Sequence, residues 1–255
     1  MSAQYHIVIP ARMASQRLPG KPLLDVGGKP LIERVHERAC LARARSVIIA
    51  TDDAEIERTA REFGAATILT STGHTSGSDR IAECVDALGW SDDTLVVNLQ
   101  GDEPLMPPAC LDQAAELLAH ETSASAASLY WPIDSMTESE DPNVVKVVTA
   151  GDGAALYFSR SVIPHPRGLA QPDCSAQPDS CWKRHIGLYA YRAGALRAFT
   201  SMPATPLEQI EKLEQLRFLE SGHRIIMAKA TEFIPAGVDT PEDLRRVRKY
   251  FARTT

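Results

Sequence analysis

A chain of 255 residues, of which 44% are apolar, is long enough to form one α/β domain with a sizeable core. Its 33 acidic residues outnumber its 27 basic residues, and the formal charge of −6 argues against a general nucleic-acid-binding protein. No apolar stretch approaches the roughly 20 residues of a membrane span, and the first residues form a strand pattern instead of a secretory leader, so we expect a cytoplasmic protein.

The first half of the chain alternates between strand and helix patterns. Apolar strands are predicted at 5–9, 46–51, 67–69 and 94–99. Amphipathic helices are predicted at 30–41, 53–63, 78–88 and 107–120. This alternation is typical of a doubly wound, mostly parallel sheet, in which ligands bind beyond the carboxyl ends of the strands.

The second half of the chain is less regular. Strands are predicted at 124–130, 144–149, 154–159, 183–191 and 225–230, and helices at 193–200, 210–221 and 241–252. Residues 164–181 are rich in Pro, Gly, Ser and Asp, which predicts a long surface loop. We expect a single domain over residues 1–255, with a small inserted β lobe within 124–200 that binds a second substrate or contacts a second subunit.

The five cysteines are odd in number and irregularly spaced. Cys40 and Cys84 fall on helical patterns, where we expect small buried thiols. Cys174 and Cys181 lie in the polar loop, but a zinc site there would lack a second ligand pair.

The strand at 5–9 leads into a loop that concentrates positive charge. Arg12, Arg17 and Lys21 lie within ten residues, and Gly20 allows a tight bend. An Arg guanidinium fits two phosphate oxygens and a Lys ammonium adds a mobile point charge, so the loop favours a nucleoside triphosphate. A solvated turn is the alternative. The dinucleotide fingerprint and the phosphate-loop motif are both absent, since the glycine spacing differs and Pro22 follows Lys21.

Two acidic residues are candidates for a metal site. Asp102 follows the strand at 94–99, and Gly101 lets the backbone turn there. A carboxylate in that place fits Mg²⁺, which prefers one or two carboxylates together with phosphate oxygens. Asp239 precedes the last predicted helix, where an N-cap is the simpler interpretation, as a turn cap is for Asp102. Glu103 is either a further ligand or a solvated side chain.

The segment at 74–80 is a further candidate for ligand binding. Ser78 lies at the start of a predicted helix, whose free N–H groups suit an anion or a base edge. Arg80 lies in the first turn, against the preference of the helix dipole, which indicates a binding role. A chance surface position is the alternative for Arg80.

The second half supplies polar residues suited to a hydroxylated, carboxylated small molecule. His185 and Tyr189 lie four residues apart and therefore share one side of a predicted strand. Arg160 follows another strand, and Glu214 and Gln215 lie on a predicted helix. A structural core histidine and a solvated glutamate are the alternatives for His185 and Glu214.

Several motifs occur in a fixed order over about residues 5–249: PARMASQRLPGKPL, ATD, HTSGSDR, VNLQGDEP, DPNVVKVV, ALYFSR, HIGLYAYR, PLEQIEKLEQLR and GVDTPEDLRRV. Together they resemble the 3-deoxy-D-manno-octulosonate (Kdo) cytidylyltransferases, the CMP-Kdo synthetases. The resemblance implies a nucleotidyltransferase-type α/β fold and the reaction of CTP with Kdo to give CMP-Kdo and pyrophosphate for lipopolysaccharide biosynthesis. It also implies a Mg²⁺-dependent, cytoplasmic homodimer.

The resemblance assigns roles to individual residues, motif by motif. The catalytic residues it implies are Arg12, Arg17, Lys21, Asp102 and Asp239, of which Asp102 and Asp239 hold the metal. The nucleotide-binding residues it implies are Ala11, Arg12, Lys21, Ser78 and Arg80. The positions it implies around Kdo are Gln100, Arg160, His185, Tyr189, Glu214 and Gln215.

Other functions stay open at this point. A cytidylyltransferase for another 2-keto sugar acid, such as 8-amino-Kdo or a sialic acid, is a close alternative, although HIGLYAYR and LEQLR favour Kdo over sialate. A glycosyltransferase would carry an Asp-x-Asp metal motif, whereas Asp52 and Asp53 are adjacent and begin a predicted helix. A non-catalytic nucleotide-binding regulator would lack one of the two metal carboxylates, and both are present.

Overall fold

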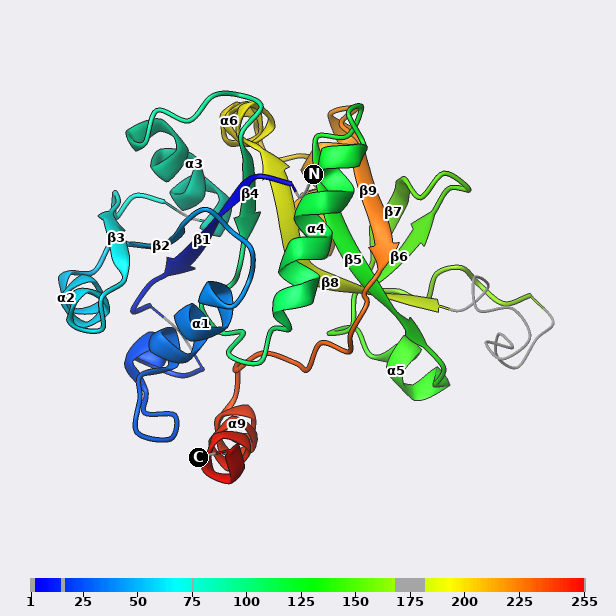
Figure 1. The fold of residues 1–255 in the computed structure, drawn as a ribbon. Helices are drawn as coiled ribbons and strands as arrows, with labels where there is room; N and C mark the ends of the chain where they lie inside the picture. Colours follow the sequence, from blue (N-terminus) through cyan, green and yellow to red (C-terminus); the bar gives the residue numbers. More distant parts are fainter. Residues whose placement is uncertain (1–2, 15–16, 75, 168–181, 255) are drawn as a thin grey trace.

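The computed structural model describes residues 3–14, 17–74, 76–167 and 182–254, which contain one nine-stranded sheet (Figure 1). Seven strands are ordered β3-β2-β1-β4-β8-β5-β9. In chain order these are β1 Tyr5–Ala11, β2 Val47–Thr51, β3 Ala66–Leu69, β4 Leu95–Asn98, β5 Ala126–Ile133, β8 Trp182–Arg192 and β9 Ile225–Lys229. A hairpin of β6 (Lys146–Thr149) and β7 (Ala155–Ser159) joins β8 through the pair Lys146–Arg184.

The prediction of a mostly parallel α/β sheet is confirmed. β1 is parallel to β2 and β4, β2 to β3, and β5 to β9, whereas β8 runs antiparallel to β4 and β5. Parallel neighbours end at the same edge of a sheet, so the segments that follow β1 and β4 meet there. β5 and β8, which lie within the expected lobe at 124–200, are strands of the main sheet, and the substrate or dimer role of this region stays a prediction.

Helices cover both faces of the sheet because strand residues alternate between two apolar clusters (Figure 1). Ile7 and Ile9 of β1 pack in the cluster that includes α1, α2 and α4, and Val8 packs in the cluster that includes α3, α6 and α8. Burial on both faces explains why the strands are continuous apolar runs. The helices are α1 Leu31–Cys40, α2 Ala54–Glu62, α3 Gly77–Ala87, α4 Pro108–His120, α5 Met136–Glu140, α6 Ala193–Ser201, α7 Pro206–Glu211, α8 Gln215–Glu220 and α9 Pro241–Thr254.

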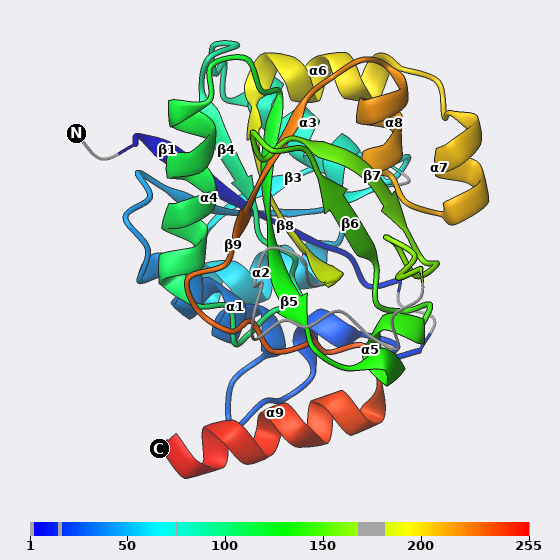
Figure 2. The same cartoon turned by 90° about the vertical axis from the view of Figure 1, so that its right-hand side faces the viewer.

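The C-terminal helix α9 lies at one end of the molecule, beside the segment between β1 and α1 (Figure 2). Leu244 and Val247 of α9 are buried in a third apolar cluster, which also contains Leu18 and Val26. Val238, in the segment that leads into the helix, belongs to the same cluster. This packing holds Asp239, the residue after Val238, at the edge of the sheet where β1 and β4 end. Within the described residues, no helix combines the length and the apolar character needed to cross a membrane.

The single helix predicted at 210–221 is wrong, because two short helices, α7 and α8, occupy this region. Lys212 has a φ of 55°, in the left-handed region, and this conformation ends α7. Glu208 accepts a hydrogen bond from the Thr205 N–H at 3.1 Å, which satisfies a free donor at the start of α7, before the predicted start. The other predicted elements are present at closely matching positions, and α5 is an additional short helix. Most of the loop predicted at 164–181 lies outside the described residues.

The expectation of buried thiols is confirmed for Cys84 and wrong for Cys40. Helix α1 buries Ile32 and Val35 against the sheet, and Cys40 lies on its exposed side, with Sγ 3.6 Å from the Nε2 atom of His36. Cys174 and Cys181 lie outside the described residues, so the zinc alternative at these positions is not tested.

The edge formed by β1 and β4 depends on the absence of a side chain at Gly101. A Cβ atom added there would lie 2.8 Å from the Pro10 carbonyl oxygen, which belongs to the backbone of β1. We therefore expect Gly101→Ala to lower the free energy of unfolding in urea by about 1–3 kcal/mol, the usual cost of overpacking. Gly151→Ala is the control, because a Cβ atom there meets nothing within 4 Å. Equal stability of the two variants would contradict this close approach.

Candidate active site

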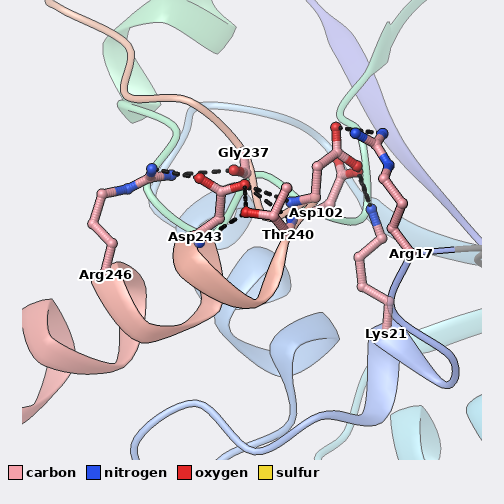
Figure 3. Close-up of polar contacts among 8 residues, drawn as sticks. Arg17, Lys21, Asp102, Gly237, Thr240, Asp243 and Arg246 are labelled. Carbon is pink, nitrogen blue, oxygen red and sulfur yellow. Dashed lines mark hydrogen bonds and ion pairs between the residues drawn. The ribbon is translucent and has the colours of Figure 1, made fainter.

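Three charged side chains from distant parts of the chain meet at this edge of the sheet (Figure 3). The Nζ atom of Lys21 lies 2.7 Å from Oδ2 of Asp102 and 2.9 Å from Oδ1 of Asp239. Lys21 is the first residue of a short 3₁₀ helix after β1 (η1, Lys21–Leu23), Asp102 follows β4, and Asp239 precedes α9. The single ammonium group of Lys21 therefore contacts both carboxylates.

The electrostatics of this cluster favour the charged form of Lys21. Partial burial acts to lower the pKa of Lys21, but the charges and hydrogen bonds of Asp102 and Asp239 outweigh it and raise the pKa above its ordinary value. Arg17 adds an ion pair, with Nη2 3.1 Å from Oδ2 of Asp239, while its side chain stays 66% exposed. Arg12 is also exposed, on the same loop.

The interpretation of Asp239 as the N-cap of α9 is wrong, because Thr240 takes that position. The hydroxyl of Thr240 accepts a hydrogen bond from the Asp243 N–H (3.2 Å), and Asp243 Oδ2 accepts one from the Thr240 N–H (3.0 Å). The Asp239 carboxylate is thereby left for the cluster with Lys21. The Asp102 carboxylate likewise accepts a hydrogen bond from Lys21, and none from a turn N–H among the residues that the structure describes.

Glu103 differs from its neighbour Asp102. Burial raises the pKa of Glu103 to about 8, and the charges of Asp102 and Asp239 add to this effect. A carboxyl group with this pKa is mostly protonated at neutral pH. Glu103 does not line the cavity described next, and its side chain lies against Gly237 instead.

A cavity of about 800 Å³ opens in front of the charged cluster. Its volume is in the range of sites for small-molecule ligands and cofactors. Eight of the predicted site residues line it, from β1 and the loop after it, the start of α3, the end of β4 and the segment before α9. The lining comprises Pro10, Ala11, Arg12, Ala14, Arg17, Lys21, Pro22, His74, Ser76, Gly77, Arg80, Gln100, Gly101, Asp102 and Asp239.

Arg80 is a buried charge at the wall of this cavity. Its side chain is 3% exposed, its Nη2 atom donates to Oδ2 of Asp52 at 2.8 Å, and Nη1 donates to the hydroxyl of Thr70. The ion pair with Asp52 compensates a cation in the first turn of α3 and rules out a chance surface position. The start of α3 is capped by Ser76, whose hydroxyl accepts from the Asp79 N–H at 3.1 Å.

A second cavity, of about 210 Å³, adjoins the first, and Gln100 lines both. Besides Gln100, four other residues predicted around the second substrate line it: His185, Tyr189, Glu214 and Gln215. Ser78, predicted at the nucleotide, also lines this cavity, and its hydroxyl donates to Glu214 Oε2 at 3.2 Å. The remaining lining residues are Asn98, Gly187, Tyr191, Phe199 and Phe218.

Three buried polar atoms of this second cavity have no hydrogen-bond partner among the described residues: His185 Nε2, Tyr189 Oη and Glu214 Oε1. Burial lowers the pKa of His185 to about 3, so its imidazole is neutral. Burial raises the pKa of Glu214, although Ser76 and Ser78 hydrogen-bond to it. An unpaired buried polar atom is costly, so three of them lining one cavity indicate a site for a polar ligand.

Arg160 lies elsewhere and is not among the residues lining either cavity. Its Nε atom donates to the Glu211 carbonyl oxygen at 2.8 Å, and Nη1 donates to the Pro142 carbonyl oxygen at 2.9 Å. Its backbone N–H donates to the Glu211 carboxylate at 3.0 Å. Arg160 thus joins the end of β7 to α7, and its predicted contact with a sugar stays a prediction.

The glycosyltransferase alternative loses its metal motif. The Asp53 carboxylate caps α2 by accepting from the N–H groups of Glu55 and Ile56, at 2.9 and 3.0 Å. Asp52 is engaged by Arg80. Within the described residues, no three His, Cys, Asp or Glu side chains cluster as a metal site. A metal held by Asp102 and Asp239 would complete its shell with water and ligand oxygens, as Mg²⁺ commonly does.

The cytidylyltransferase family model matches residues 6–225, which is most of the chain. The chain therefore belongs to the cytidylyltransferases, which are enzymes of the nucleotidyltransferase class. Two curated relatives define the family more narrowly. The 3-deoxy-manno-octulosonate cytidylyltransferase of Chromohalobacter salexigens is 53% identical over 248 residues, with 96% of each chain covered. That of Cellvibrio japonicus is 50% identical over 246 residues, again with 96% of each chain covered.

A solved structure of CMP:2-keto-3-deoxy-manno-octonic acid synthetase complexed with CTP has a TM-score of 0.88 to this fold. It is 38% identical, and the match covers 99% of this chain and 100% of that one. The chain belongs to the family of 3-deoxy-manno-octulosonate cytidylyltransferases, and the resemblance seen in the sequence motifs is confirmed.

The neutral state of His185 predicts a pH dependence of stability. An unfolded histidine titrates near about pH 6.5, so between this pH and about 3 the unfolded chain binds more protons than the folded chain. Acidification over this range should lower the free energy of unfolding, with up to about 1.4 kcal/mol per pH unit contributed by His185. We expect His185→Asn to have a shallower slope in urea unfolding between pH 6.5 and 4.

The control is His120→Asn, at the exposed end of α4, which tests whether loss of any histidine changes the slope. Identical slopes for the wild-type protein and His185→Asn would contradict a buried, neutral imidazole.

Proposed function

We propose that this protein transfers the cytidylyl group of CTP to 3-deoxy-D-manno-octulosonate, giving CMP-Kdo and pyrophosphate. The observation that carries the proposal is the pair of adjoining cavities that share Gln100: one is lined by a cluster of charged groups, and the other by buried hydrogen-bonding groups, three of which have an unpaired atom. The names of the relatives support CTP and Kdo, and favour Kdo over its 8-amino analogue.

The first cavity suits CTP. Arg12, Arg17 and Lys21 line one wall and are suited to the triphosphate, because guanidinium and ammonium groups neutralise phosphate oxygens. Ala11, at the end of β1, lines the same wall. Arg80 lines the cavity at α3, where its pairing with Asp52 gives the guanidinium a fixed orientation toward the nucleotide.

Asp102 and Asp239 are the residues suited to hold Mg²⁺. Their oxygens lie within 2.9 Å of one ammonium nitrogen, and oxygen donors of this kind match the preference of the ion. When bound there, Mg²⁺ would neutralise phosphate charge and make the attacking hydroxyl more acidic.

The second cavity suits the sugar acid. The unpaired Glu214 Oε1 would accept a hydrogen bond from a sugar hydroxyl, and the unpaired Tyr189 hydroxyl would donate one to a sugar oxygen. The neutral imidazole of His185 offers a further hydrogen-bonding nitrogen without adding charge. Gln100, between the cavities, is positioned to contact the sugar where it meets the nucleotide.

The chemistry requires positioning and charge neutralisation more than a side-chain nucleophile. The anomeric hydroxyl oxygen of Kdo forms a bond to the α-phosphorus of CTP, and the bond from that phosphorus to the leaving oxygen of pyrophosphate breaks. The hydroxyl proton passes to water. Arg12, Arg17 and Lys21 stabilise the charge that grows on the departing pyrophosphate.

Three further properties belong to this proposal. We propose that the protein works in the cytoplasm as a homodimer and supplies lipopolysaccharide biosynthesis, as is consistent with a nucleotidyltransferase of this family.

The test is pyrophosphate release from each of the four nucleoside triphosphates, combined with Kdo, 8-amino-Kdo or a sialic acid and Mg²⁺. We expect turnover with CTP and Kdo, and much lower rates with the other pairs. Asp102→Asn should reduce this turnover by orders of magnitude and keep the fold, since one carboxylate of the metal site is lost.

Asp93→Asn, an exposed aspartate in the turn before β4, is the matched control and should keep wild-type turnover. Faster reaction with another acid or another nucleotide would overturn the proposed substrates. Wild-type turnover in Asp102→Asn would contradict its assigned role.

A further inference from the structure

The turn at 236–240, which carries Asp239, packs tightly against the loop that carries Asp102. The Val238 N–H donates to the Asp102 carbonyl oxygen at 2.8 Å. A Cβ atom added at Gly237 would lie 3.0 Å from the same oxygen and 3.1 Å from Oε1 of Glu103. The two segments that supply the carboxylates are therefore in direct backbone contact.

The opposite side of this turn is held by two residues of α9 (Figure 3). Nη2 of Arg246 donates to the carbonyl oxygens of Ala236 (2.7 Å) and Gly237 (3.2 Å). Nη1 of Arg246 donates to Oδ1 of Asp243 at 2.5 Å. A single guanidinium thus links the helix to the turn.

Asp243 connects this guanidinium to Asp239 itself. Its Oδ2 atom accepts from the Asp239 N–H (3.2 Å), the Thr240 N–H (3.0 Å) and the Thr240 hydroxyl (2.8 Å). Burial acts to raise the pKa of Asp243, but the hydrogen bonds from Thr240 and Asp239 and the ion pair with Arg246 lower it overall. Asp243 is therefore a carboxylate with donors on both oxygens.

This network does more than cap a helix. A capping box needs Thr240 and Asp243, whereas the carbonyl groups held by Arg246 lie outside the helix, on the approach to Asp239. The Arg246 side chain is 46% exposed, and ion pairs with exposed members contribute little to stability. Such a link is better explained by control of geometry than by stability.

We propose that Asp243 and Arg246 are positioning residues that fix the Asp239 carboxylate relative to Asp102, and so set the affinity for the metal–nucleotide complex. This inference rests on the proposed function. Neither residue lines either of the two cavities described above, so both act through Asp239. Supporting contacts behind metal ligands typically change metal affinity by about 10–100-fold when they are lost.

The test compares Arg246→Ala, Arg246→Lys and Asp243→Asn with two controls on the same helix, Arg245→Ala and Glu242→Gln. The control residues form an exposed ion pair with each other, and neither bonds to the turn at 236–240 in the described contacts. The readouts are Mn²⁺ affinity by electron paramagnetic resonance with a CTP analogue that carries a methylene between the α- and β-phosphorus atoms, the KM for Kdo, and the Tm.

We expect Arg246→Ala and Asp243→Asn to weaken Mn²⁺ binding by about 10-fold or more and to leave the KM for Kdo unchanged. Arg246→Lys should be as impaired as Arg246→Ala, because one ammonium group cannot reproduce the forked contacts. Both control variants should match the wild-type protein. The variants of the half-exposed Arg246 should fold. The test therefore stays decisive even if Asp243→Asn fails to fold.

Wild-type Mn²⁺ affinity in Arg246→Ala, with or without a lower Tm, would mean that the contacts of Asp243 and Arg246 only cap the helix. That result would overturn the proposal. Full affinity in Arg246→Lys would do so as well, since charge alone would then suffice. A wild-type protein that binds neither Mn²⁺ nor the CTP analogue would contradict the proposed function first, and this inference with it.

Discussion

The contact of Lys21 with Asp102 and Asp239 is the interaction on which the rest of the site depends. Two carboxylates this close repel each other, and a shared ammonium group offsets the repulsion in a partly buried place. The fold meets this requirement by ending β1 and β4 side by side and by packing α9 against the loop after β1. Loss of the parallel β1–β4 pairing or of the α9 contact would separate the three charges.

The two cavities differ in the kind of selectivity they offer. The first is charged, so it favours a polyanion through neutralisation, and its walls carry three cations from one loop. The second is lined in part by aromatic rings, and burial keeps His185 neutral and raises the pKa of Glu214. Its selectivity therefore depends on hydrogen bonding, which rejects analogues that leave buried polar atoms unpaired.

The sequence predicts the sheet well, because its strands are buried on both faces and stand out as apolar runs. It fails at 210–221, since the left-handed residue that ends α7 is Lys212 and not a glycine. At Asp239-Thr240, two neighbouring residues can cap α9, and the contacts of Asp243 decide between them. The partners of Arg160 lie up to 52 residues away, beyond any local pattern. Asn98 is a polar residue in an otherwise apolar strand, and it lines the second cavity. A polar side chain at such a position is the sequence signal that could have located this cavity.

In the proposed reaction, Asp102 and Asp239 act on one metal ion. A double-mutant cycle of Asp102→Asn and Asp239→Asn, measured as Mn²⁺ affinity with a non-reacting CTP analogue, shows whether the two carboxylates share an ion. Two ligands of one ion should be coupled, so that the double variant departs from the sum of the single effects by about 0.5–3 kcal/mol. Effects that add within about 0.5 kcal/mol would mean that the two carboxylates act independently, and would contradict the account.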